Sequence, residues 1–328
     1  MELVVQPLGR SLAVKAGDNL LEALQANGVP VSYSCRAGRC GTCRCKVLEG
    51  KVLESGRDAK ITNPGEDDHV LACMSVLTEN CVVEIPEPDE IVAHPARVLK
   101  GTVVEIEDLT HDIKRLVVKS AKPLSFSPGQ YAILQFTPEH VRPYSMAGLP
   151  EDDTLEFHIR HVPGGRVTGY VFNALKVGDP VRVSGPMGTA YLRRKHEGPL
   201  LCIAGGTGLA PVLSIVRGAT ALKMTNPIHL YFGVRSSADI YGQHWLARLA
   251  ESNPRMHVHV VIATNESGAG YRVGLVTDAV AADWKDLRDW RAYLCGAPPM
   301  VEAATLIAKS KGIEPDHIYA DAFYASAN

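Results

Sequence analysis

The sequence predicts a multidomain protein of α+β and α/β class: a small N-terminal α+β domain, an antiparallel β-barrel and a C-terminal parallel sheet with helices on both faces. Three observations lead to this prediction. Cysteines concentrate before residue 85, short β patterns fill residues 97 to 192, and strand-like and helical runs alternate after residue 193. The 328 residues leave room for two or three domains. We expect them at 1–88, 97–193 and 194–328.

The first segment has the pattern of a hairpin followed by a short helix. Leu3 to Val5 and Ser11 to Val14 are strand-like and are separated by a Gly-Arg turn. Asn19 is a good N-cap residue, and Glu22 follows three positions later, as in a capping box. The segment therefore predicts strands, one helix, a cysteine-rich loop and further strands. A Pro- and acid-rich run at 86–96 then has the composition of an extended linker.

The two later segments differ in the elements that they predict. The middle segment contains four strand-like runs divided by Pro- and Gly-rich turns, which favours a small antiparallel barrel: 103–108, 113–118, 131–136 and 155–161. In the last segment, apolar strand-like runs alternate with helical stretches, which indicates βαβ units and a parallel sheet. Its expected strands are 200–204, 228–234, 257–263, 292–295 and 317–320.

Composition and charge narrow the possible classes of protein. Hydrophobic residues make up 46% and charged residues 21%, as in ordinary globular domains. The formal net charge is −2, whereas a general nucleic-acid binder is usually basic. The chain has neither a long apolar run nor an N-terminal secretion pattern. We therefore expect a cytoplasmic protein with no nucleic-acid or membrane partner.

The cysteine spacing is the strongest chemical signal. Cys35, Cys40, Cys43 and Cys73 form C-x4-C-x2-C-x29-C, the spacing of a plant-type 2Fe–2S cluster. Two alternatives remain: buried core cysteines, which are common, and a zinc site, which more often uses paired C-x2-C elements. The loop around these cysteines is rich in Gly and Arg, unlike a core, so we predict the cluster. Cys45 is interpreted as structural.

Two motifs in the middle segment suit a flavin. Arg142-Pro143-Tyr144-Ser145 offers a guanidinium for a phosphate, a flat ring for the isoalloxazine and a hydroxyl for the flavin N5. The alternative interpretation of this tetrapeptide is an ordinary strand end that binds no cofactor. A second phosphate-binding turn is expected where backbone N–H groups precede a helix. Its residues are Gly165, Arg166, Val167 and Thr168.

The last segment carries two motifs for a nicotinamide dinucleotide. A Gly-rich turn follows the first strand and opens a helix, as in a pyrophosphate site, although it is not the standard G-x-G-x-x-G. Its residues are Gly205, Gly206, Thr207 and Gly208. Cys295 and Gly296 end a later parallel strand and are expected beside the nicotinamide. The alternatives are a tight strand–helix turn and a core cysteine.

The loop after Val234 bears on the choice between NADH and NADPH. Asp239 is able to accept hydrogen bonds from ribose hydroxyls and would repel a 2′-phosphate. Arg235 would instead attract that phosphate. We expect NADH as the donor, with use of NADPH left open.

These motifs, in this order, resemble the iron–sulfur flavoprotein reductases of multicomponent ring-hydroxylating oxygenases. The resemblance is greatest to the naphthalene-dioxygenase type, with its nitroarene and salicylate 5-hydroxylase relatives, and covers the chain from Cys35 to the ending Tyr319 to Tyr324. It implies a ferredoxin domain, an FAD barrel and an NAD(P)H domain. It also implies a C-terminal aromatic residue over the flavin, for which we expect Phe323, with Tyr324 as the alternative.

The resemblance also implies a reaction. NADH gives a hydride to FAD, and single electrons pass through the 2Fe–2S cluster to a Rieske-type ferredoxin, which feeds a terminal oxygenase. Ser145, Tyr144, Thr207 and Cys295 are the expected catalytic residues. The first alternative is direct delivery to an oxygenase, as in benzoate dioxygenase or phenol and methane monooxygenase systems. A non-catalytic redox module and FMN in place of FAD are further alternatives.

Overall fold

The computed structural model describes residues 1–31, 33, 36, 38, 43–54, 60–62, 69–85, 94–264 and 270–324. The chain divides into two compact units, Met1–Ala96 with Gly185–Thr189, and Arg97–Ser184 with Ala190–Asn328. The second unit holds both the barrel and the parallel sheet, each with its own core. The domain boundaries at 1–88, 97–193 and 194–328 stay predictions, and of the predicted linker at 86–96, residues 86–93 lie outside the described residues.

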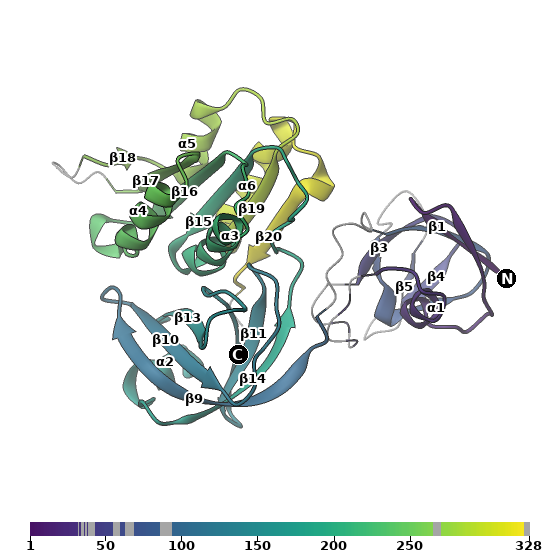
Figure 1. Cartoon of the computed structure of the whole chain (residues 1–328), viewed down its shortest axis with the longest axis horizontal. Helices are drawn as coiled ribbons and strands as arrows, with labels where there is room; N and C mark the ends of the chain where they lie inside the picture. The colour runs from purple at the N-terminus through teal and green to yellow at the C-terminus, as the bar shows by residue number, and fades with distance from the viewer. Residues whose placement is uncertain are drawn as a thin grey trace. The chain divides into compact units, whose positions relative to one another are not determined.

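The N-terminal unit is a small α+β fold (Figure 1). Its strands form a five-stranded sheet in the order β2-β1-β8-β3-β6 and a three-stranded sheet in the order β5-β4-β7. The predicted hairpin is confirmed, since β1 and β2 pair antiparallel. The elements are β1 (Glu2–Gln6), β2 (Arg10–Ala13), α1 (Leu20–Ala26), β3 (Arg44–Glu49), β4 (Val52–Glu54), β5 (Lys60–Thr62), β6 (His69–Leu71), β7 (Ser75–Leu77) and β8 (Cys81–Glu84).

Helix α1 begins where the capping pattern predicts. The Asn19 side chain accepts a hydrogen bond from the Glu22 backbone N–H at 3.2 Å. The apolar side of the helix, Leu20, Leu21 and Leu24, is buried against the sheet. Helix α1 is therefore held on the sheet of the N-terminal unit by its apolar side chains.

The middle part of the chain is a six-stranded antiparallel barrel in the order β12-β11-β14-β9-β10-β13. A bridge between Met146 and Phe157 links the two end strands and nearly closes it. Strands β12 and β14 were not predicted from the sequence. The elements are β9 (Arg97–Asp108), β10 (Ile113–Ser120), β11 (Tyr131–Thr137), β12 (His140–Ser145), β13 (Leu155–Arg160), α2 (Arg166–Asn173) and β14 (Pro180–Met187).

The C-terminal part is a parallel sheet in the order β18-β17-β16-β15-β19-β20. The strand order reverses at β15, and ligands of such sheets bind beyond the carboxyl ends of strands at that point. The elements are β15 (Leu200–Gly205), α3 (Leu209–Ala221), β16 (Ile228–Val234), α4 (Gln243–Ser252), β17 (Met256–Ile262), β18 (Arg272–Val273), α5 (Val276–Asp283), β19 (Arg291–Gly296), α6 (Pro298–Ser310) and β20 (Ile318–Ala322).

Helices cover both faces of this sheet (Figure 1). Leu200 and Cys202 point to the face covered by α3 and α4, whereas Leu201 and Ile203 point to the face covered by α5 and α6. The strand is therefore apolar throughout, as the sequence pattern predicts for a sheet buried on both sides. None of the helices in the described ranges is both long and apolar enough to cross a membrane.

Candidate active site

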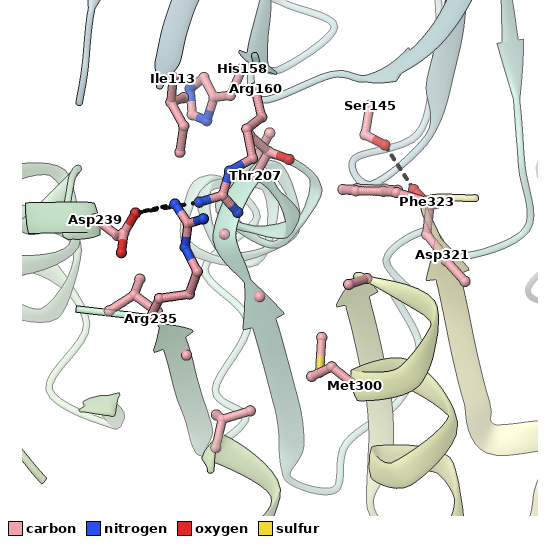
Figure 2. Close-up of a pocket in the computed structure, with 18 of the residues that line it drawn as sticks. Ile113, Ser145, His158, Arg160, Thr207, Arg235, Asp239, Met300, Asp321 and Phe323 are labelled. Atoms are coloured by element: carbon pink, nitrogen blue, oxygen red, sulfur yellow. Dashed lines mark hydrogen bonds and ion pairs between the residues drawn. The ribbon is translucent and has the colours of Figure 1, made fainter. Parts of the chain in front are cut away.

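A cavity of about 710 Å³ lies within the second unit, where the barrel meets the carboxyl ends of the parallel strands (Figure 2). Strands β12 and β13 of the barrel form one wall. The turn after β15, the loop after β16 and the segment after β20 form the others. Of the predicted cofactor-binding residues, ten line this cavity: Arg142, Tyr144, Ser145, Thr168, Gly205, Gly206, Thr207, Arg235, Asp239 and Phe323.

Ser145 ends β12 and makes the hydrogen bond that joins the two halves of the site. Its hydroxyl donates to Asp321 Oδ2 at 2.7 Å, as the dashed line in Figure 2 marks. Burial raises the pKa of Asp321, and the hydrogen bond from Ser145 partly offsets this. The serine oxygen is thereby held in one orientation with its lone pairs free of the carboxylate.

Tyr144 carries an orphaned polar atom. Its ring packs on the barrel core, and its buried hydroxyl has no hydrogen-bond partner among the described residues. Burial also raises the pKa of this phenol, so the group stays protonated. A buried hydroxyl without a partner costs about 1–3 kcal/mol, which a bound ligand with a suitable acceptor would recover. The residues of this wall therefore fit a flavin.

The C-terminal segment forms the wall next to β12. Strand β20 pairs with β19, and the Phe323 backbone N–H donates to the Gly296 carbonyl at 2.9 Å. Arg142 donates to the Tyr324 carbonyl at 3.0 Å. Both residues line the cavity, but Phe323 lies near Ser145 in Figure 2, while Tyr324 is 67% exposed. Phe323 is thus the better placed of the two aromatic residues.

The Gly-rich turn forms the floor beyond β15. Gly206 has φ +55°, a conformation that favours glycine, and starts the turn Gly206–Gly208 before α3. A Cβ on Gly208 would lie 2.0 Å from the Cys295 carbonyl oxygen, so only glycine allows the turn to lie against β19. Gly208 itself is buried and outside the cavity lining.

The predicted phosphate-binding turn of the barrel, Gly165 to Thr168, makes hydrogen bonds within its own segment. Gly165 is the N-cap of α2, and Thr168 Oγ1 accepts the Val162 backbone N–H at 3.1 Å. Thr168 reaches the cavity, whereas Gly165, Arg166 and Val167 are outside its lining.

Cys295 and Gly296 lie behind the Gly-rich turn. The Cys295 side chain is fully buried, and burial, with the nearby Asp321, raises its pKa well above the ordinary value of a thiol. It is therefore a neutral thiol, and neither residue belongs to the cavity lining. Its predicted place beside the nicotinamide stays a prediction.

Four charged residues link the barrel to the loop after β16. Arg160 donates to Asp112 at 2.8 Å and to Asp239 at 3.3 Å. Arg235 donates to the same two carboxylates, at 2.9 Å and 2.7 Å, and Figure 2 shows both guanidinium groups beside Asp239. Although burial raises the pKa values of Asp112 and Asp239, hydrogen bonds led by Arg160 and Arg235 respectively lower them below the ordinary value. The network is charge-balanced.

Several residues of the lining were missed by the sequence analysis, because no local pattern marks them: Tyr131, His158, Arg160 and Asp321. Asp321 is within the ending that carries the family resemblance, which is the one signal that points toward it.

The N-terminal unit brings together two of the predicted cluster ligands. The Cys73 backbone N–H donates to Cys43 Sγ at 3.4 Å. The hydrogen bond with Cys43 lowers the pKa of Cys73 to about 6, against the effect of burial, which favours a thiolate. Cys35 and Cys40 lie outside the described residues. Cys45 is 2% exposed, and burial raises its pKa to about 12. The thiols of Cys43 and Cys73 therefore fit a metal cluster, and that of Cys45 fits a core position.

Three protein-family models match the chain in succession. Residues 3–78 match the 2Fe-2S iron-sulfur cluster binding domain, residues 100–191 the oxidoreductase FAD-binding domain, and residues 202–305 the oxidoreductase NAD-binding domain. The cofactor set predicted from the motifs is thus confirmed at the level of domains.

Comparison with characterised proteins shows relatives of the same length. The chain is 60% identical over 324 residues to the ferredoxin–NAD(P)+ reductase component of the naphthalene 1,2-dioxygenase system of Pseudomonas putida, covering 99% of both chains. It is 61% identical over 326 residues to that of the naphthalene 1,2-dioxygenase/salicylate 5-hydroxylase systems of a Ralstonia species, again with 99% of each covered. A crystal structure of a cytochrome P450 reductase from Amycolatopsis has a TM-score of 0.73 at 36% identity, with 98% of both chains covered. The chain therefore belongs to the family of iron–sulfur flavoprotein reductases that serve as ferredoxin–NAD(P)+ reductase components of multicomponent oxygenase systems.

Proposed function

We propose that this chain is the NADH-dependent reductase of an aromatic-ring dioxygenase or hydroxylase system, and that it delivers electrons to a separate Rieske-type ferredoxin. The observation that carries the proposal is the meeting of two motifs in one cavity. The Gly-rich turn at Gly206 and Thr207 and the Ser145–Asp321 pair line the same space. The full-length relatives in naphthalene dioxygenase systems support the choice of oxygenase class.

The barrel residues would hold FAD. Bound FAD would accept the electron pair of a hydride and release electrons singly. The Tyr144 ring offers a flat surface and its hydroxyl a donor without a partner, while Arg142 and the first turn of α2 offer positive charge for phosphates. Ser145, oriented by Asp321, would hold the reacting ring by a hydrogen bond at a fixed position. Phe323 would cover the ring and exclude water from it.

The nucleotide loop favours NADH over NADPH. Arg235 is the residue that would attract a 2′-phosphate, but its guanidinium is already bound by Asp112 and Asp239. The 2′-phosphate of NADPH would have to break these ion pairs and lie close to two carboxylates. We therefore assign the nicotinamide donor as NADH.

Changing Asp239 to serine should weaken this preference. In Asp239→Ser, Arg235 loses one carboxylate and the repulsion of a phosphate falls. The ratio of kcat/KM for NADH to that for NADPH is expected to drop about tenfold, mostly through a lower KM for NADPH. Asp153→Ser, at an exposed barrel position, serves as the control. An unchanged ratio in Asp239→Ser would contradict the assignment.

Reconstitution tests the proposed electron acceptor. The holoenzyme is mixed with NADH and a naphthalene-type terminal dioxygenase, with and without the purified Rieske-type ferredoxin. We expect product formation to need the ferredoxin, while reduction of ferricyanide proceeds without it. Equal product formation in its absence would favour direct delivery to the oxygenase.

A cytoplasmic location is part of the proposal. Besides the predicted cluster ligands, four cysteines in the described ranges are free thiols: Cys45, Cys81, Cys202 and Cys295. Free thiols in this number are typical of a reducing compartment. Fractionation of cells that express the chain would test this.

A further inference from the structure

A buried histidine of the barrel contacts Tyr241, which is hydrogen-bonded to the Gly-rich turn. The His158 side chain, on β13, has no exposure to solvent. Its ring stacks on Trp245 of α4, with centroids 5.6 Å apart, and meets the Tyr241 ring edge-on at 5.3 Å. Figure 2 shows His158 near Thr207 of the turn. No motif of the sequence analysis includes this group.

One hydrogen bond within β13 and two beyond it form a chain that reaches the turn. His158 Nε2 lies 3.1 Å from Glu156 Oε1, and His158 Nδ1 lies 3.1 Å from the Tyr241 hydroxyl. That hydroxyl is in turn 3.4 Å from the Gly206 carbonyl oxygen. A continuous polar chain therefore runs from Glu156 to the first residue of the Gly-rich turn.

The positions of the protons follow from the chemistry of the end groups. Burial raises the pKa of Glu156, but hydrogen bonds from His158 and Arg115 outweigh it and lower the pKa to about 2. Glu156 is therefore a carboxylate that only accepts, and His158 Nε2 must donate to it. Burial raises the pKa of Tyr241, so this phenol keeps its single proton.

That single proton has two acceptors within reach. If His158 is neutral, Nδ1 is bare and accepts the Tyr241 proton, which leaves the Gly206 carbonyl without it. If His158 is an imidazolium, Nδ1 donates to the Tyr241 oxygen, and the hydroxyl donates to Gly206. The protonation of His158 thus decides whether the turn is held by this hydrogen bond.

We propose that His158 is a positioning residue for the nicotinamide dinucleotide: as an imidazolium, it directs the Tyr241 hydroxyl onto the Gly206 carbonyl and holds the turn in its binding conformation. The inference rests on the proposed nucleotide site. The turn has φ +55° at Gly206, so an outside contact to its carbonyl helps to fix which way its N–H groups point. Binding of the dinucleotide is then linked to the proton on His158.

The charged groups around His158 come from several elements. The ring donates to the Glu156 carboxylate and stacks on Trp245 of α4. Arg115 is paired with Glu156, and Arg160, two residues along β13, is paired with Asp112. Arg217 and Arg248 line a second cavity of about 310 Å³ together with Trp245, and Arg217 is paired with Asp152. Among these groups, the Glu156 carboxylate is the one that is hydrogen-bonded to the ring.

Calorimetric titration of the oxidised holoenzyme with NAD+ tests the proposal without relying on turnover. For the unaltered chain, we expect the Kd to rise about tenfold between pH 6 and pH 9.5, the cost of losing one hydrogen bond to the turn. Tyr241→Phe should bind about tenfold more weakly at pH 6, show no pH dependence, and match the unaltered chain at pH 9.5. His158→Gln, whose amide does not titrate over this range, should also give a Kd that does not change with pH.

Tyr293→Phe is the matched control. Tyr293 is also a buried tyrosine of this unit, but its hydroxyl accepts the Arg193 backbone N–H at 2.9 Å, away from the turn. We expect it to lower Tm and to keep the pH profile of the unaltered chain. A level profile in the unaltered chain, or Tyr241→Phe binding equal to it at pH 6, would overturn the role of His158. Absence of any NAD+ binding by the unaltered chain would instead overturn the proposed nucleotide site, and this inference with it.

Discussion

Cys73→Ala is expected to lower electron transfer from NADH to a one-electron protein acceptor at least about 100-fold, because a plant-type cluster is held by four Cys thiolates and this change removes one of them. The Cys73 backbone N–H donates a hydrogen bond to Cys43 Sγ. The pKa of the Cys73 thiol is lowered to about 6, which favours a thiolate at neutral pH. Reduction of ferricyanide, which takes electrons from the flavin, should stay within about twofold of the unaltered chain. Steady-state assays with cytochrome c and with ferricyanide measure the two activities.

Cys45→Ala is the control for this prediction. Cys45 is two residues from Cys43, but its sulfur is buried in the core of the N-terminal unit and its pKa is raised by burial. The variant should keep the visible absorption of the cluster and both activities, with some loss of stability from the small cavity. Loss of the cluster in Cys45→Ala together with its retention in Cys73→Ala would contradict the ligand assignment.

Ser145→Ala is expected to slow reduction of the flavin by NADH about 100-fold, with the affinity for NADH changed far less. The hydroxyl is held by Asp321 at 2.7 Å, so its removal deletes a preorganised polar contact to the reacting ring, which typically costs about 10²–10³ in rate. The change also leaves the buried Asp321 carboxyl without this partner. Stopped-flow absorbance of the flavin band, under anaerobic conditions, measures the rate.

Ser214→Ala separates this effect from a loss of packing. Ser214 is also a buried serine of the second unit, and its hydroxyl donates to the Gly148 carbonyl at 2.6 Å, outside the cavity lining. We expect the variant to be less stable but to reduce its flavin at the normal rate. A normal rate in Ser145→Ala would remove Ser145 from the set of catalytic residues.

Much of the fold follows from local patterns. The apolar runs of the parallel sheet, such as 228–234, match β16 residue for residue, because both faces of that strand are buried. Strand β12 was missed because it has no regular alternation of apolar and polar side chains and contains Pro143, which is tolerated since β12 is at one end of the strand order. Strand β14, which begins at Pro180, was missed for a similar reason.

The site could be predicted only where its residues are neighbours in the sequence. The tetrapeptide ending at Ser145 and the turn at Gly206 are short contiguous motifs, and both reach the cavity. Asp321 lies 176 residues after the serine that it orients, and Tyr241 lies 83 residues after His158. Such pairs are created by the packing of the barrel against the sheet, and no periodicity in the sequence encodes them.

Anaerobic titration of the holoenzyme with NADH, followed by visible absorption and by EPR, tests the central claim that one chain carries electrons from the nicotinamide site to the cluster. We predict bleaching of the flavin absorbance and a rhombic EPR signal of a reduced 2Fe–2S cluster, complete at about 1.5 equivalents of NADH, because the flavin takes an electron pair and the cluster a single electron. Bleaching of the flavin without a cluster signal would contradict the account, since a cluster held by the N-terminal unit would then not receive electrons from the flavin.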